Sequence, residues 1–325
     1  MEHSKITPGN ASSPPAQESS SYFKDNTVRI AGIGQLIADT ALLTYGIAKN
    51  DFKIGSIGIL GYTAGFIGTR YGSPKSERQL QLVERDLGQY LRQQGVTLPK
   101  HPTLQNLTQA GGVIEHVEAF LYAYPTQLMN ACFGLMGVQF MRAGVRDTNK
   151  AQMASGALMM AASLAGLLIQ EQKPDPEHPP QGAMQKTWSW IQEKPLRLTG
   201  ALLNLNQVFI ARDAWNESKN PGNKAYLLKY LAVAGFTLCN TMLALSSQGD
   251  GGGAQLDDVS RKALSEAAAH AIVSQPKEVQ NGLLEHVAGF LSTQPYVHMS
   301  AADISTQLRQ KLSESHIALA PGRQL

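Results

Sequence analysis

The chain has 325 residues, of which 43% are hydrophobic and 16% are charged, and its formal net charge is +3. This small charge, with no stripe of basic and aromatic residues, argues against nucleic acid as a partner. The mean hydropathy of −0.18 is too low for a chain made mostly of membrane helices and fits one that combines membrane helices with polar helices.

Residues 1–21 are rich in Ser, Pro, Gln and Glu and contain no apolar run, which predicts a disordered tail. The tail has neither the apolar core of a signal peptide nor the Arg-rich amphipathic face of a mitochondrial presequence. Its composition resembles the unstructured N-termini of secreted bacterial effectors. An effector inserted into a host membrane is therefore one alternative for the function.

Residues 22–72 predict a first membrane hairpin. Two apolar runs, 28–48 and 54–68, flank a short tip that contains two lysines and one aspartate. The pattern Gly61-x-x-x-Gly65 in the second run is typical of helices that pack closely in lipid. We therefore expect a close helix contact there.

Residues 125–171 predict a second hairpin with the same plan, an apolar run, a charged tip and an apolar run. The second run, 151–170, carries no charge and matches the roughly 20 residues that a helix needs to cross a bilayer. The competing interpretation is a soluble all-α protein with buried apolar helices, because runs near this length are ambiguous.

Residues 195–247 predict a third hairpin that is more polar than the others. Its first run, 198–211, is short, and its second run, 225–246, contains Lys229 near its start, where a lysine can extend to the interface. The first run carries three amide side chains, on Asn204, Asn206 and Gln207. The prediction is an all-α, multi-pass membrane protein with six membrane helices, or four if this hairpin does not span.

The segments between the hairpins are polar. Residues 73–124 predict a module of amphipathic helices, because apolar residues recur there with helical spacing. Residues 172–194 begin with a Pro-rich, charged stretch and predict a linker. Trp188 and Trp190 lie near its end, a position that suits an aromatic anchor at the membrane interface.

Residues 248–325 predict a C-terminal helical module that begins with a Gly-rich joint. Ser300 with Asp303 has the spacing of a helix-capping pair. After it comes a stripe with i, i+4, i+8 spacing: Ile304, Leu308 and Leu312.

An internal repeat relates the two polar modules. Residues 112–131 read GVIEHVEAFLYAYPTQLMNA, and residues 282–301 read GLLEHVAGFLSTQPYVHMSA. Nine positions agree without a gap, so residues 73–124 and 248–325 are interpreted as related modules that pack side by side.

The repeat carries a Glu-His pair in each copy, Glu115 with His116 and Glu285 with His286. A metal or proton site is one interpretation of these residues. However, adjacent residues on a helix point about 100° apart, so one pair cannot chelate a metal from one face. We therefore predict solvated helix positions, with no metal and no cofactor.

Asp39 lies near the middle of the first apolar run. An ionisable group at that depth raises the hypothesis of a transport or proton site. Asn204, Asn206 and Gln207 are the candidates for a polar path beside it. The alternative is that all four side chains join neighbouring helices by hydrogen bonds, which we favour because a single acid defines no relay.

The chain has no P-loop, no G-x-S-x-G, no H-E-x-x-H and no dinucleotide fingerprint. The predicted function is therefore a non-enzymatic membrane protein whose partners are the lipid bilayer and a protein bound by the helical modules. A small-solute or ion transporter is the alternative, and the oligomeric state stays open. Basic residues are nearly balanced between the tips and the opposite end, and we place the termini and modules in the cytosol.

Overall fold

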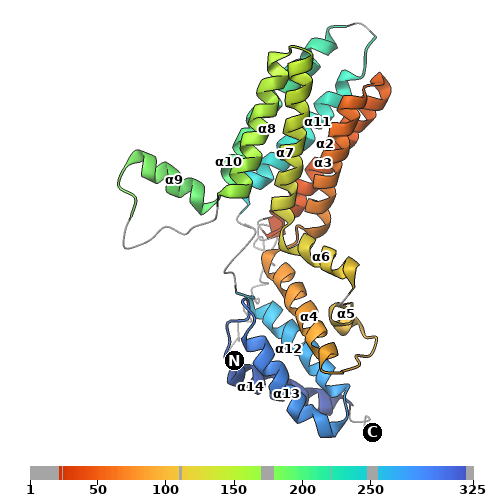
Figure 1. Ribbon diagram of the computed structural model, residues 1–325, viewed down its shortest axis with the longest axis vertical. Coiled ribbons are helices and arrows are strands. Elements are labelled where there is room, and N and C mark those ends of the chain that lie inside the picture. Colours follow the sequence, from red (N-terminus) through yellow and green to blue (C-terminus); the bar gives the residue numbers. More distant parts are fainter. Residues whose placement is uncertain are drawn as a thin grey trace, which may run out of the picture.

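The computed structural model describes residues 22–23, 25–109, 112–169, 179–220, 222–246 and 255–319, with side chains described up to residue 314. Within these ranges the secondary structure is helical throughout, so the predicted all-α class is confirmed. The predicted tail, residues 1–21, lies outside them, as do most of the Pro-rich stretch and the Gly-rich joint. Figure 1 shows an upright helical bundle above a smaller helical domain.

The bundle consists of three consecutive helix pairs. They are α2 (Thr27–Lys49) with α3 (Phe52–Tyr71), α7 (Pro125–Arg146) with α8 (Lys150–Leu168), and α10 (Leu196–Ser218) with α11 (Tyr226–Leu245). Helices within a pair pack together, and the pairs also contact one another through α3 with α7, α8 with α10, and α11 with α2. The six helices therefore form a closed ring.

The turn of the first pair follows directly from its sequence. Asn50 ends α2 in the left-handed conformation, with φ 52°, and its amide donates to the carbonyls of Gly46 and Ile47. The Asp51 side chain then caps α3 by accepting hydrogen bonds from the amides of Lys53 and Ile54. Asn tolerates a positive φ and Asp is a good N-cap, so two residues reverse the chain.

Glycines allow the helices of the ring to approach closely. A Cβ at Gly65 would lie 2.8 Å from the backbone nitrogen of Leu36, so the predicted close contact of α3 with α2 is present. A Cβ at Gly137 would lie 2.9 Å from the carbonyl oxygen of Gly156 across the second pair. Packing of this kind stabilises helix association without a hydrophobic driving force.

Only three described helices are long and apolar enough to span a membrane by themselves: α2, α8 and α11. The prediction of six such helices, or of four, is therefore wrong by this criterion. Each pair holds one of the three. Their partners α3, α7 and α10 contain glycine, amide and charged residues among the apolar ones. Such residues lower the mean hydropathy of each helix.

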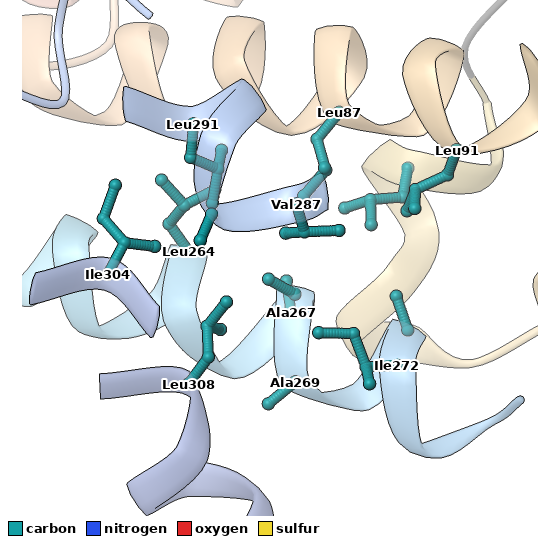
Figure 2. Packing of buried hydrophobic residues seen from close by; sticks show 14 of the residues in the cluster. Leu87, Leu91, Leu264, Ala267, Ala269, Ile272, Val287, Leu291, Ile304 and Leu308 are labelled. Carbon is teal, nitrogen blue, oxygen red and sulfur yellow. The ribbon is translucent and has the colours of Figure 1, made fainter. Parts of the chain in front are cut away.

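The smaller domain combines two parts of the chain. One part is α4 (Lys75–Gln93), the 3₁₀ helix η1 (Pro102–Leu104) and α5 (Gln105–Thr108), and the other is α12 (Asp258–Val273), α13 (Lys277–Ser292) and α14 (Ala301–Leu319). Helices α4 and η1 pack against α12, and α4 packs against α13. Figure 2 shows the leucine-, isoleucine- and alanine-rich core between them.

The last helix agrees with its sequence pattern. Ile304 and Leu308 are buried in the core, and Leu312 packs against it. The Ser300 hydroxyl accepts a hydrogen bond from the Asp303 amide at 3.1 Å, so the predicted cap is formed.

Two short helices lie at the margins of the bundle and the domain. Helix α6 (Val113–Ala123) runs crosswise between the bundle and the domain and contacts α3, α4 and α7 (Figure 1). Helix α9 (Ala183–Glu193) projects to the side of the bundle (Figure 1). The segment predicted as a linker thus contains a helix, on which Met184 and Trp188 are four residues apart and share one face.

Candidate functional site

The interior of the helix ring combines an apolar core with a set of buried polar side chains. Buried polar residues come from five of the six helices: Gln35 and Asp39 of α2, Asn130 of α7, Ser155 and Ser163 of α8, Thr199, Asn206 and Gln207 of α10, and Asn240 of α11. Polar groups removed from water need partners, so each of these residues constrains how the helices pack.

Asp39 is fully buried between three helices. Its Oδ2 accepts a hydrogen bond from Gln35 Nε2 at 2.6 Å, one helical turn away. Gly61 of α3 faces the carboxyl group and leaves the space that it occupies, because a Cβ at that position would overlap it. Within the described part of the chain, Asp39 Oδ1 has no hydrogen-bond partner. The predicted intramembrane candidate is therefore enclosed by protein.

The three candidate amide side chains of α10 have different neighbours. Asn206 accepts a hydrogen bond from the Ser155 hydroxyl at 2.5 Å, which joins α10 to α8. Gln207 donates to the carbonyl of Leu203 at 3.1 Å within its own helix. Asn204 instead faces α11, where its Nδ2 lies 3.5 Å from Thr241 Oγ1. Asn204 is therefore separated from the other two candidates.

A small cavity lies at the centre of the ring. Its volume is about 20 Å³, and its polar lining consists of Gln35, Asn206, Gln207 and Asn240. A space of this size holds about one water molecule. Asp39 is connected to this cavity through its hydrogen bond to Gln35. Of the three residues named as candidates for a polar path, Asn206 and Gln207 line this cavity and Asn204 does not, while Asn240 was not among the candidates.

A second polar cluster lies near the tips. Lys229 is 5% exposed, and its Nζ donates to the carboxylates of Asp213 and Glu217. The ammonium also lies 4.6 Å from the centre of the Tyr45 ring, and the Tyr45 hydroxyl donates to Glu217 at 2.6 Å. Lys229 is therefore an internal cross-link between α2, α10 and α11. Its extension to the interface stays a prediction, and in the structure two acids one turn apart on α10 bind its ammonium group.

Polar contacts between the tips close this end of the ring. Lys53 of the first tip pairs with Asp147 of the second at 2.8 Å. Lys49 of the first tip donates to Asn223 of the third at 2.9 Å. All three pairs are thus joined where their chains reverse.

The Glu-His pairs of the repeat do not converge on one site. Glu285 accepts hydrogen bonds from Arg309 at 2.6 Å and Ser305 at 3.1 Å, which join α13 to α14. The Arg309 guanidinium lowers the pKa of Glu285. His116 lies on exposed α6, with Nδ1 2.8 Å from the Gly112 carbonyl oxygen. Among the described residues no three metal-ligating side chains come together.

Comparisons with protein-family models, curated proteins and solved structures found no match to this chain. Its function is therefore argued from its own geometry.

Proposed function

We propose that the chain is a non-enzymatic integral membrane protein. The six-helix ring spans the bilayer, and the smaller domain is held at the membrane surface to bind a protein partner. One observation carries this proposal: the ring buries polar side chains among its apolar core residues and exposes large hydrophobic side chains on its outer surface. Its outward-facing large hydrophobic residues come from all six helices and include Ile37, Ile59, Phe66, Leu135, Leu164, Leu205 and Leu238.

This exterior is what supports membrane insertion of α3, α7 and α10. These helices are too polar or glycine-rich to qualify alone, but Asn130 of α7 and Asn206 and Gln207 of α10 are buried. Phe66, Leu135 and Leu205 remain on the outer surface of α3, α7 and α10, at about half exposure. A continuous apolar surface of this extent is expected to contact lipid or another protein. Each helix therefore enters the bilayer as a partner of α2, α8 or α11.

The orientation is part of the proposal. The smaller domain lies at the end of the ring opposite the tips (Figure 1), and we place it in the cytosol with both termini. A folded domain at the surface, joined to a closed ring, suits a scaffold that presents α12, α13 and α14 to a partner.

The experiment is alkaline extraction of membranes that contain the expressed protein, with cysteine labelling from each side. Ser12, Ser218 and Ser313 are changed one at a time to cysteine in a chain whose Cys132 and Cys239 are alanine. We expect retention in the membrane, labelling at positions 12 and 313 from the cytosolic side, and labelling at 218 from the other. Release by alkali, or labelling of all three positions from one side, would contradict the proposal.

The second candidate function is transport of a small solute or ion. It rests on the enclosed Asp39 carboxyl group, with its partnerless Oδ1, beside the central cavity. The small volume of that cavity and the joined tips favour the scaffold. The variant Asp39→Asn separates the two. If the wild type carries ion or solute flux in proteoliposomes and the folded variant does not, the result supports transport. Absence of flux in the wild type rules out transport.

A further inference from the structure

The two copies of the repeat have opposite burial. In α13, Leu284 and Val287 are 1% and 0% exposed and belong to the domain core, where Figure 2 shows Val287. The equivalent residues of α6, Ile114 and Val117, are 80% and 55% exposed. Related sequences therefore build an amphipathic helix twice, but protein covers Leu284 and Val287 of α13 and leaves Ile114 and Val117 of α6 exposed.

The opposite face of α6 is already held by protein. Arg85 of α4 pairs with Glu118 at 2.7 Å and donates to the carbonyl of Glu115 at 3.1 Å. Tyr122 is buried and packs edge-on against Tyr71 of α3. A helix turns 100° per residue, so Glu115, Glu118 and Tyr122 lie on the side away from Val113, Val117 and Phe120. The apolar face of α6 is thus directed away from α4 and the smaller domain.

This face consists of four residues, all more than half exposed: Val113, Ile114, Val117 and Phe120. We call it the α6 stripe. Tyr124, at 39% exposure, continues it, and Pro125 then begins α7. The stripe therefore lies beside the first turn of a bundle helix, at the end of the ring opposite the tips.

The first helices of the other pairs are preceded by similar residues. Trp188 and Trp190 of α9 are about half exposed and lie shortly before α10 begins. Tyr22 and Phe23 are exposed shortly before α2 begins. Because α2, α7 and α10 all begin at the end opposite the tips, exposed aromatic residues recur there on three sides of the ring. Trp and Tyr are enriched at this depth, where membrane meets water.

We propose that α6 is an interfacial helix whose stripe inserts into the boundary between phospholipid headgroups and acyl chains. This inference rests on the proposed membrane location of the ring. The stripe directly precedes α7, which exposes Leu135 and Val138, and the aromatic residues before α2 and α10 precede helices that begin at the same end of the ring. A helix with one apolar face and one polar face, held on its polar side, binds a bilayer in this orientation.

The test uses full-length protein in phosphatidylcholine–phosphatidylglycerol vesicles, with both native cysteines replaced by alanine. A fluorescent label is attached to Val117→Cys, and quenching by lipids that carry a spin label in the acyl chain is measured. Leu164→Cys on the outer face of α8 reports on the ring. Val279→Cys, which is half exposed on α13, is the control on the domain, away from α6.

We expect at least twofold quenching of the labels at 117 and 164 and none at 279. Quenching at 164 without quenching at 117 overturns the interfacial helix and leaves the membrane ring intact. Absence of quenching at both positions contradicts the proposed function itself. A label at 117 that becomes shielded only when a protein extract is added, without quenching by lipid, assigns the stripe to a protein and also overturns the proposal.

Discussion

The ring and the smaller domain differ in what they expose. In the domain, leucines such as Leu87 and Leu284 are buried, as in a water-soluble protein. In the ring, Asp39 and Asn206 are buried while Leu164 and Leu205 are exposed. Hydrophobic burial stabilises the domain core, and in the ring the buried apolar residues are joined by close helix packing and internal hydrogen bonds.

The largest expected effect comes from comparing the substitution of one leucine in each region. Leu284→Ala removes a side chain that is 1% exposed, and we expect a loss of about 2–5 kcal/mol in domain stability. Leu164→Ala acts on a side chain that is 54% exposed, and we expect a change within about 0.5 kcal/mol. Denaturant unfolding in detergent micelles, with hydrogen exchange assigned to α8 and α13, measures both. Equal losses at the two positions would show that the outer face of the ring is covered by protein.

The next test compares two ion pairs of the ring. Lys229→Met leaves Asp213 and Glu217 without their cation. We expect a loss of up to about 3 kcal/mol, below the full value for a buried pair because Asp213 is 62% exposed. Lys53→Met breaks a pair with both side chains more than 40% exposed, and less than about 1 kcal/mol is expected. Thermal unfolding midpoints in one detergent rank the two variants, and the reverse order would mean that Lys229 is not a cross-link.

The sequence predicted local features well where all the residues that determine a feature lie close together in the chain. The charged tips, the Ser300 cap and the stripe at Ile304 and Leu308 each rest on residues close in sequence, and the structure has them. Lys229 illustrates the limit. Its partners lie on another helix, and only the packing of α10 against α11 brings them within hydrogen-bonding distance.

The candidate site was predicted only in part, because contacts between different helices determine the rest of it. Asp39 was identified because a charge in an apolar run is costly wherever it lies. Asn204 and Asn206 have the same residue type and differ by two positions, yet they face different neighbours. The repeat shows this most clearly, because Val117 and Val287 share a sequence frame but differ completely in burial. Burial depends on what the rest of the fold places beside a helix.

A third test uses glycines. Gly137→Ala places a methyl group 2.9 Å from the Gly156 carbonyl, so we expect a loss of about 1–3 kcal/mol as α7 and α8 separate. Gly282→Ala on α13 meets no atom within 4 Å among the described residues, and we expect a gain of about 0.5–1 kcal/mol. Thermal unfolding of each variant decides the sign. A gain from both substitutions would mean that the helices of the second pair are not in close contact.

The smallest expected effect is a pH dependence confined to the domain. Glu84 is buried beneath α5, and this burial raises its pKa even though Asn106 donates a hydrogen bond to the carboxylate. A carboxyl group with a raised folded pKa binds its proton more tightly in the folded state than in the unfolded one. The contribution of Glu84 to domain stability is therefore fully present at low pH and is lost as pH rises from the ordinary glutamate range through the folded pKa.

The variant Glu84→Gln keeps an acceptor for Asn106 and removes the ionisation. Above the folded pKa we expect this variant to be more stable than the wild type, and its stability to fall less between pH 4.5 and 7, a window that begins at the ordinary glutamate pKa. Arg309 lowers the pKa of Glu285, so the contribution of Glu285 to stability changes with pH in the opposite direction. Glu285 is present in both the wild type and the variant, so the difference between their stabilities isolates the effect of Glu84. Hydrogen exchange of α4 measured across this window should therefore slow in the variant while exchange in the ring stays unchanged. A parallel change in the ring would mean that the two regions do not unfold separately.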